Sequence, residues 1–501
     1  MESDTQKPGK AIKHSTIYAM GNLSRQIVSF IMLPVYTRFL TPADYGVVGL
    51  LTLSLSIIEP FLGARLGDAI PRFFYAEKTT QRQNAVVSTA FIVTFAISLA
   101  TVLVLFALKS PISNTIFGTD KYSNEVGIFS ILFLTQAIEY YGFTYIRIQQ
   151  KPKLFIALSL AKMVSQITLN LLLIVFWKLG VMGMVVSNVV SSLIISMGLT
   201  AYAFKHVGFG FSQTLAKDLF KFSWPLWISG LATLYIYSSN RYLIRIFGSI
   251  DQVGLYELAA RIAAVLGILV WSPFYQYWET EQFRIQHQPN AKSTFKTSFT
   301  LILIILAICT SGLSILSYPV IAIMASEQFH GAAFAVSFLT VGTLFANLAT
   351  FASFGFFSAG ATGWVSKINI GSAVLITALN AALIPSFGFY GAASALMITL
   401  AAQFLASNYF SKKFFDMEIN IFPVLVIGGI IVATGSLAEF IPYQNFFVGL
   451  SLSAILIALT AAAIFVIALQ TTSDKERLKT EIRAYMGTAQ RAIQRVVSRN
   501  K

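Results

Sequence analysis

Residues 15–46 read STIYAMGNLSRQIVSFIMLPVYTRFLTPADYG. As a helix, this stretch is long and apolar enough to cross a lipid bilayer, for which roughly 20 residues suffice. Arg25 lies inside it, about 15 Å from its start at a rise of 1.5 Å per residue. A cation at that depth is costly in lipid, so it normally faces the protein interior or a water-filled pathway. The stretch predicts a transmembrane helix that lines a polar interior.

The composition of the whole chain is that of an integral membrane protein. Of its 501 residues, 56% are hydrophobic and 11% are charged, and the mean hydropathy is +0.70. Soluble domains carry about 25% charged residues, so this chain belongs in lipid. Its single cysteine, Cys309, excludes an intramolecular disulfide and a multi-cysteine metal site. Residues 1–14 are polar and basic, and no small-residue cleavage site follows them, so we expect the first apolar segment to be retained.

Hydropathy predicts an all-α membrane protein with about fourteen transmembrane helices. Lipid offers no hydrogen-bond partner to an open backbone, so each span must be helical. The connections are short, and we expect no separate soluble domain. The spans are expected near residues 15–39, 45–66, 84–108, 126–147, 154–177, 181–204, 222–247, 252–275, 295–317, 329–357, 364–385, 389–411, 420–440 and 445–470.

The basic residues predict the orientation of the chain. With the N-terminus in the cytoplasm, most Lys and Arg residues lie in the inner loops, which is the positive-inside pattern. This pattern accounts for the formal net charge of +15 without nucleic acid. Both termini are expected in the cytoplasm, and residues 471–501 read as a basic amphipathic helix on the inner membrane surface. The outer side holds Arg38, Lys109, Lys121, Lys178 and Arg245.

The chain contains an internal repeat at an offset close to 208 residues. Each single match is weak, but the matches occur in the same order in both halves, which argues for a duplication. The matched pairs are Arg38-x5-Asp44 with Arg245-x5-Asp251, Pro111 with Pro319, and Gly180-x2-Gly183 with Gly388-x2-Gly391, the last pair following Asn170 and Asn380. Between them, Pro71–Glu77 resembles Pro273–Glu279 at a shifted offset of 202.

Each copy holds six spans, so both copies enter the membrane from the same side. We therefore expect two pseudo-symmetric six-helix bundles that rock about a central site in alternating access. The predicted divisions are a cytoplasmic tail at 1–14, bundles at 15–205 and 222–412 joined by a cytoplasmic linker at 206–221, two extra helices at 413–470, and the tail at 471–501.

Several charged groups lie inside the predicted spans. Arg25, Lys162 and Arg241 are the hardest to explain as structural residues, because no opposite charge lies on the same helical turn. Glu257 and Arg261 are four residues apart in the order that favours a helical ion pair, so they could neutralise each other.

Several cations in one membrane cavity favour a polyanion, above all a phosphate or pyrophosphate. Acidic groups in the same spans could relay a proton or sodium ion, or serve as structural counter-ions. Tyrosine rings offer faces on which sugars stack. The candidate cations are Arg25, Lys162, Arg241 and Arg261. Secondary candidates are Asn22, Gln26, Arg65, Arg72, Tyr140 and Tyr237, and the ion-coupling candidates are Glu59, Glu139 and Glu257.

The opening stretch resembles the first span of the O-antigen and polysaccharide flippases. So do Gly67–Tyr75, which read GDAIPRFFY, and the Asn-then-Gly-x2-Gly motif that closes each half. These flippases form the polysaccharide transporter branch of the multidrug/oligosaccharidyl-lipid/polysaccharide exporter superfamily. The resemblance covers essentially the whole chain. It implies that the protein moves an undecaprenyl-pyrophosphate-linked oligosaccharide, such as an O-antigen, capsule or exopolysaccharide repeat unit, across a bacterial inner membrane.

The resemblance also implies where the substrate is bound. The cationic cavity of the family would correspond to Arg25, Lys162, Arg241 and Arg261, and the last two helices would guide the lipid tail. No cofactor is expected, but coupling to a proton or sodium gradient is. The implied partners are membrane lipid and the lipid-linked glycan, with a polysaccharide polymerase and a chain-length regulator as further candidates.

Other functions remain open at this point. A peptidoglycan lipid-precursor flippase would need the same basic cavity, whereas a cation-coupled multidrug exporter would need anionic or neutral binding groups. A glycan polymerase or acyltransferase is not favoured, because the four histidines are scattered and form no catalytic pair with a nearby acid. We therefore expect a transporter and not an enzyme.

Overall fold

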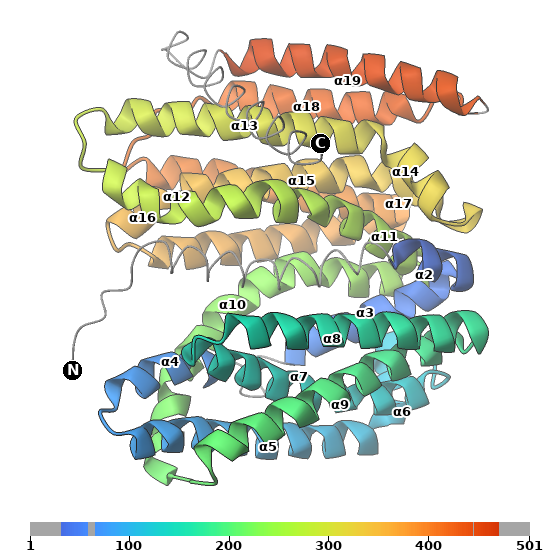
Figure 1. Ribbon diagram of the computed structural model, residues 1–501. Coiled ribbons are helices and arrows are strands. Elements are labelled where there is room, and N and C mark those ends of the chain that lie inside the picture. Colours follow the sequence, from blue (N-terminus) through green and yellow to red (C-terminus); the bar gives the residue numbers. More distant parts are fainter. Residues whose placement is uncertain (1–31, 59–65, 444, 470–501) are drawn as a thin grey trace, which may run out of the picture. The chain divides into compact units, whose positions relative to one another are not determined.

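The computed structural model describes residues 32–58, 66–443 and 445–469. Within these residues every regular element is helical, as the sequence predicts (Figure 1). The chain divides into two compact units. The first comprises the residues up to Glu257 together with Met324–Phe329, and the second comprises Leu258–Ile323 and the residues from His330 onward. The bundle and linker boundaries expected from the sequence stay a prediction.

The helices of the first unit begin with the two that border the opening stretch. They are α2 (Leu33–Phe39), α3 (Pro42–Ile58), α4 (Leu66–Ala76), α5 (Thr80–Ala107), α6 (Lys109–Phe117), α7 (Ser123–Ile148), α8 (Pro152–Asn170), the π-helix η2 (Leu171–Phe176), α9 (Gly180–Val207) and α10 (Gln213–Phe247). Helix α11 (Ile250–Leu266) crosses the division between the units.

The helices of the second unit follow α11. They are the π-helix η3 (Gly267–Trp271), α12 (Ser272–Ile285), α13 (Ala291–Ile315), α14 (Ser317–Met324, whose last residue belongs to the first unit), α15 (Ala332–Ala352), α16 (Phe354–Ser358), α17 (Gly363–Ser411), α18 (Ile421–Ala438) and α19 (Phe446–Ala468). A 3₁₀ turn, η4 (Glu327–Phe329), lies in the first unit.

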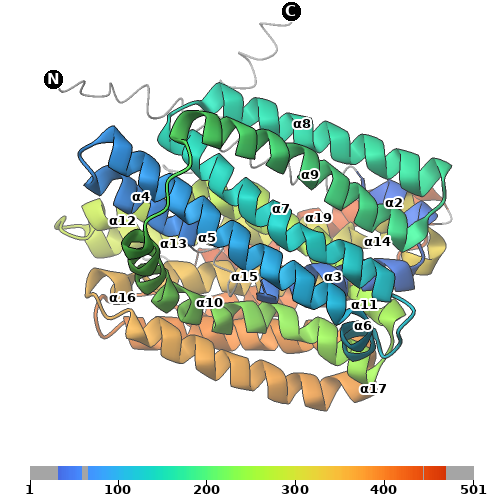
Figure 2. The ribbon, with the colours of Figure 1, turned by 90° about the horizontal axis from the view of Figure 1, so that it is seen from below.

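In the first unit, α7 packs against α5 on one side and α9 on the other, and α9 packs against α8 (Figure 2). Apolar side chains fill the contact between α5 and α7, where the rings of Phe91 and Tyr141 lie 5.8 Å apart edge to face. Both rings are buried. Helix α7 is therefore the central helix of this group, and a polar residue in its middle, such as the buried Glu139, is enclosed by neighbouring helices.

In the second unit, α15 packs against α17 and α13, and α13 packs against α18 and α19. Aromatic rings form much of its core, since Phe295, Phe351 and Phe354 are all buried. The Trp278 ring of α12 stacks on Phe351 with its centroid 5.0 Å away. This unit is held together largely by apolar contact, whereas the first unit also encloses charge.

Ten helical segments among the described residues are long and apolar enough to cross a membrane. One of them, α17, contains two of the expected spans, 364–385 and 389–411, joined at a break where Gly388 has φ 56° and ψ −138°. Helices α3 and α10 overlap two more of the expected spans, 45–66 and 222–247. The all-α membrane class is confirmed, and the exact number of fourteen spans stays a prediction.

The internal repeat is visible in the backbone. Gly180 and Gly388 are equivalent at an offset of 208 residues, and they have φ angles of 55° and 56°. Such positive φ angles are open to glycine at little steric cost, which explains why both copies use it. The Gly-x2-Gly motif therefore marks the same turn in each copy.

Helices α3 and α11 are equivalent in the repeat, and both belong to the first unit where they meet. They approach so closely that a Cβ atom on Gly46 would lie 2.2 Å from the Ile250 carbonyl oxygen. A Cβ on Gly254 would lie 1.8 Å from the Pro42 carbonyl oxygen. Because Gly46 and Gly254 are 208 residues apart, the crossing joins two equivalent positions.

Two further contacts in the first unit join residues of one copy of the repeat to residues of the other copy. Thr37 Oγ1 donates a hydrogen bond to the Met324 carbonyl at 2.8 Å, and Ser326 Oγ donates to the Thr37 carbonyl at 2.8 Å. Arg245 packs against Gly118, where a Cβ would lie 1.9 Å from Nη2. Gly118 and Ser326 are 208 residues apart, and Thr37 directly precedes Arg38, the repeat equivalent of Arg245. The two contacts therefore join equivalent or adjacent positions of the repeat.

Candidate functional site

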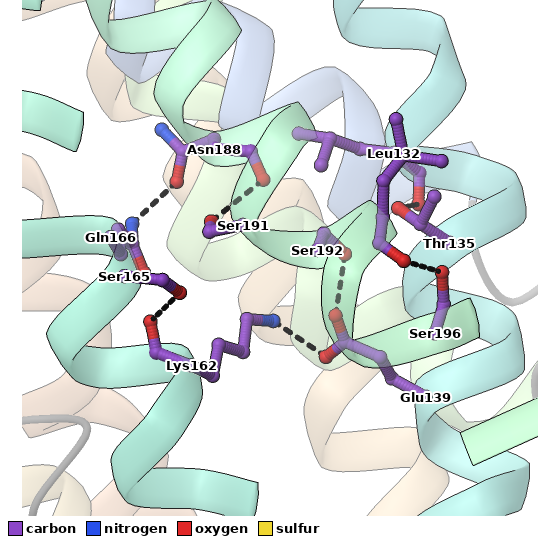
Figure 3. Close-up of polar contacts among 11 residues, drawn as sticks. Leu132, Thr135, Glu139, Lys162, Ser165, Gln166, Asn188, Ser191, Ser192 and Ser196 are labelled. Atoms are coloured by element: carbon purple, nitrogen blue, oxygen red, sulfur yellow. Dashed lines mark hydrogen bonds and ion pairs between the residues drawn. The ribbon is translucent and has the colours of Figure 1, made fainter. Parts of the chain in front are cut away.

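A buried ion pair lies among α7, α8 and α9 of the first unit. Lys162 Nζ on α8 lies 2.5 Å from Glu139 Oε2 on α7, and the two side chains are 16% and 6% exposed (Figure 3). The other carboxylate oxygen, Oε1, accepts a hydrogen bond from Ser192 Oγ on α9 at 2.5 Å. Both oxygens of Glu139 are therefore engaged, each by a different helix.

Amide side chains extend this polar cluster by one helical turn (Figure 3). Gln166, four residues after Lys162, donates from Nε2 to Asn188 Oδ1 at 2.6 Å. Asn188, four residues before Ser192, donates from Nδ2 to the Met184 carbonyl at 2.8 Å. The polar residues thus form a stripe where α8 faces α9. Gln166, Asn188 and Ser192 were not predicted from the sequence, although the spacing of four residues inside two apolar spans is a usable signal.

A second ion pair in the first unit joins α10 and α11. Arg241 donates from Nε to Glu257 Oε1, and its Nη1 donates to the Tyr237 carbonyl at 2.7 Å. The Tyr256 ring lies 5.7 Å from the guanidinium carbon, within the range of a cation–π contact. The Arg241 and Glu257 side chains are 19% and 12% exposed, so this pair is also largely enclosed.

The surroundings of Arg241 are fixed by further hydrogen bonds. Asn240 Nδ2 donates to the Tyr256 hydroxyl at 2.7 Å, and the Tyr242 hydroxyl lies 2.7 Å from Ser54 Oγ on α3. Gly49 on α3 leaves room for Glu257, because a Cβ there would lie 2.5 Å from Glu257 Cγ. Gly49 and Glu257 are equivalent in the repeat, 208 residues apart.

The structure gives two predicted cations partners that the sequence analysis did not identify. Lys162 and Arg241 lack an opposite charge on their own helical turn, but each meets a carboxylate from a neighbouring helix. Glu257 binds Arg241, whereas its helical neighbour Arg261 was the partner considered from the sequence. The positive charges of Lys162 and Arg241 are therefore neutralised by Glu139 and Glu257, and the enclosed charge is not purely positive.

The other candidates fall into two groups. Arg261 is half-buried on α11, Arg72 is exposed on α4, and Tyr140 packs against the core between α5 and α7. Tyr237 contributes its carbonyl to Arg241, and the residue is 41% exposed. The remaining candidates lie outside the described residues, and these are Arg25, Asn22, Gln26, Glu59 and Arg65.

Among the residues that the structure describes, no group of three or more His, Cys, Asp or Glu side chains could hold a metal ion. What the two pairs can do is bind ions of either sign. A lysine or arginine released from its glutamate binds anionic oxygens, and a glutamate released from its cation binds a proton or a metal cation.

Comparison with protein families gives one match over most of the chain. A family model described as "Polysaccharide biosynthesis protein" matches residues 35–334. A Haemophilus influenzae chain described as an uncharacterized membrane protein is 25% identical over 268 residues, which is 52% of this chain. The present chain spans 62% of the length of that curated relative.

Comparison with solved structures identifies the fold. The structure of a lipid II flippase, MurJ, in an inward closed conformation matches 92% of this chain and 99% of its own, with a TM-score of 0.70 and 13% identity. An inward-facing multidrug resistance MATE family transporter of the MOP superfamily matches 81% of this chain and 96% of its own, with a TM-score of 0.58 and 14% identity. At such low identity these matches establish the fold.

Proposed function

The chain belongs to the polysaccharide biosynthesis protein family, and from that premise we propose that it is a flippase for an undecaprenyl-pyrophosphate-linked oligosaccharide. It would move this lipid from the inner to the outer leaflet of a bacterial inner membrane by alternating access. The observation that carries the proposal is the reach of the family match, since residues 35–334 include both buried ion pairs. The multi-pass helical fold, shared with a flippase and with transporters, supports it.

The roles of the site residues follow from their chemistry. Lys162 and Arg241 would bind the pyrophosphate, together with Arg25 and Arg261, because ammonium and guanidinium groups are the usual protein ligands of phosphate. Glu139 and Glu257, each in contact with one of these cations, would couple transport to a proton or sodium gradient, a role also proposed for Glu59.

Further roles concern the glycan and the membrane. Tyr140 and Tyr237 would line the path of the sugar, with the secondary candidates Asn22, Gln26, Arg65 and Arg72. Helices α18 and α19 would contact the prenyl chain. We also propose that both termini are cytoplasmic and that a polymerase and a chain-length regulator act next on the glycan.

A complementation experiment tests this proposal. In cells that lack the gene, the wild-type protein should restore surface polysaccharide, whereas Arg241→Ala should not, and lipid-linked oligosaccharide should accumulate in the inner leaflet. Lys412→Ala is the matched control, because Lys412 forms an exposed pair with Asp416 at 3.5 Å. Normal surface polysaccharide in cells without the gene would overturn the proposal. Normal polysaccharide from Arg241→Ala would remove only that residue from the site.

A second candidate is a flippase for the peptidoglycan lipid precursor. It is favoured by one observation, the TM-score of 0.70 with a lipid II flippase over 92% of this chain. Rescue of cells depleted of their own lipid-precursor flippase would support this candidate. Charge does not exclude a multidrug exporter, because two of the candidate cations, Lys162 and Arg241, are paired with acids. The family match is what favours a saccharide substrate over a drug.

A further inference from the structure

We propose that Glu139 and Glu257 are ion-paired with Lys162 and Arg241 in the absence of substrate. The phosphate groups of the substrate then displace the two glutamates from these cations. This inference rests on the proposed function and says how that site admits an anionic head group. Lys162 and Arg241 are each paired with a carboxylate from a different helix. The two pairs share no residue.

A cation inside a membrane span needs a counter-charge at all times, because an unpaired charge there is costly. A carboxylate and a phosphate offer the same kind of acceptor, a negatively charged oxygen. Each glutamate therefore satisfies its cation in the way that a phosphate oxygen would. A pyrophosphate carries more negative charge than one carboxylate, so it can compete for the same donor.

At Lys162, the geometry allows the glutamate to be left behind. Only Oε2 of Glu139 contacts the ammonium, while Oε1 accepts the hydrogen bond from Ser192 at 2.5 Å. When the flexible lysine turns away, Glu139 keeps this hydrogen bond. Ser192 thus lowers the cost of separating the pair, because it leaves the buried carboxylate partly satisfied.

At Arg241, the cation is the anchored member of the pair. Its Nη1 donates to the Tyr237 carbonyl at 2.7 Å, and the Tyr256 ring lies 5.7 Å from its guanidinium carbon. These contacts do not involve Glu257, so they hold the guanidinium in place when that glutamate leaves. A guanidinium fixed in this way can bind a phosphate through two parallel hydrogen bonds.

The two glutamates are then specificity-determining residues. A neutral lipid head group offers no anionic oxygen to replace a carboxylate, and a cationic one is attracted to the glutamates instead. Only a head group with strongly anionic oxygens interacts with Lys162 and Arg241 more favourably than the two glutamates do. The site would thus select a lipid pyrophosphate and reject neutral lipids that reach the same helices.

Direct binding to the purified full chain in lipid nanodiscs tests the inference, with undecaprenyl pyrophosphate as the probe at pH 7. Glu139→Gln keeps the side-chain shape and an acceptor for Ser192 but removes the competing charge. We expect it to raise the affinity about tenfold, since a hydrogen bond to a charged group is worth at least that factor. Glu257→Gln should do the same at the other pair, and Lys162→Gln should lower the affinity about tenfold.

The control is Glu281→Gln, which removes the acid of the surface pair between Glu281 and Arg284 and should leave the affinity unchanged. Because Glu139→Gln leaves a partly buried lysine without its acid, the independent Glu257→Gln variant keeps the test decisive if the first variant does not fold. Unchanged or weaker binding in the folded glutamine variants would make the glutamates structural counter-ions and overturn the inference. A wild-type protein that neither binds nor flips the probe would overturn the proposed function itself.

Discussion

At the scale of single residues, the position of Glu257 depends on Gly49, which has no side chain. Gly49 faces this side chain, and a methyl group there would lie 2.5 Å from Glu257 Cγ. Glycines also allow the close approach of two helices where α3 crosses α11. Glu257 can lie against α3 because its repeat equivalent on that helix is Gly49, which has no side chain.

Gly49→Ala should therefore displace the Glu257 carboxylate and weaken its pair with Arg241. We expect the free energy of unfolding to fall by about 1–3 kcal/mol, the usual cost of overpacking. Thermal unfolding of the purified protein measures this change. Gly429→Ala on α18 is the matched control, because a Cβ there meets nothing within 4 Å.

A double-mutant cycle separates this clash from a general glycine effect. In the Glu257→Ala background, Gly49→Ala should cost less than in the wild type, because the clashing Cγ atom is gone. Equal costs in the two backgrounds would show that Gly49 does not position Glu257.

The start of α3 gives a second prediction. Asp44 Oδ2 accepts hydrogen bonds from the Thr41 backbone N–H at 3.0 Å and the Thr41 hydroxyl at 2.9 Å, and the Asp44 N–H donates to Thr41 Oγ1 at 3.1 Å. This is a capping box, and its loss costs about 1 kcal/mol. Thr41→Ala should lower the thermal stability by that amount. Thr115→Ala, which removes only an exposed hydroxyl bonded to the Pro111 carbonyl at 2.9 Å, should lower it less.

The sequence identified the charged residues of the site but not their pairing. Lys162 and Glu139 are separated by one loop, and Arg241 and Glu257 by another, so each pair depends on how helices pack. Hydropathy and helical spacing report on one helix at a time, which is why Glu257 was considered with Arg261 on its own helix. Gly49 had no distinctive signal, because small residues are common in membrane helices, and Ser192 had only its spacing of four residues from Asn188.

At the scale of elements, the contact between α2 and the segment at Met324–Phe329 predicts a cross-link. Thr37 and Ser326 exchange hydrogen bonds with each other's chain segments at 2.8 Å. In a background with Cys309→Ser, which removes the single native cysteine, Thr37→Cys with Ser326→Cys should form a disulfide on mild oxidation. Gel mobility with and without reductant measures it.

The cross-link should also stop transport, because alternating access requires segments of the two copies to separate on one side of the membrane. Restored activity on reduction would show that the loss is reversible and not a folding defect. The single variant Ser326→Cys in the Cys309→Ser background is the control, and it cannot cross-link within the chain. Full transport by the oxidised Thr37–Ser326 variant would mean that this contact stays closed throughout the cycle.

Helix boundaries were predicted better than helix continuity. Apolar length and loop composition locate α5, α7, α9 and α13 closely, since each is a single apolar run. The junction in α17 was different: two expected spans meet at Gly388 without a loop, because glycine allows the turn within the helix. The π-helical segments η2 and η3 also went unpredicted, because a π-turn adds a residue without changing composition.

At the scale of the whole molecule, the distribution of Lys and Arg predicts which loops face the cytoplasm. Lys121 is exposed between α6 and α7 on the predicted outer side, and His287 is exposed between α12 and α13 on the predicted inner side. In the Cys309→Ser background, a membrane-impermeant maleimide should label Lys121→Cys in intact cells. It should label His287→Cys only after permeabilisation. The reverse pattern would place the N-terminus outside.

Composition and the repeat sufficed to predict the class of the molecule, because low charge and high hydropathy leave few alternatives. The arrangement of the site was beyond them, since a membrane interior is built from contacts among helices far apart in sequence. The repeat was an exception. It relates residues 208 positions apart, and the structure shows equivalent residues at Gly46 and Gly254 in direct contact.

The contacts between the two copies bear on how the chain arose. In one, Thr37 meets Ser326, and in the other, Arg245 meets Gly118, so each copy supplies one half of both. An unduplicated ancestor could have closed these contacts only with a second identical polypeptide, as a symmetric homodimer. Fusion of two such genes would then have freed the copies to diverge, so that Glu257 could evolve opposite a glycine. In a homodimer, the positions equivalent to Gly49 and Glu257 would be the same residue, so both would have been glutamate or neither would.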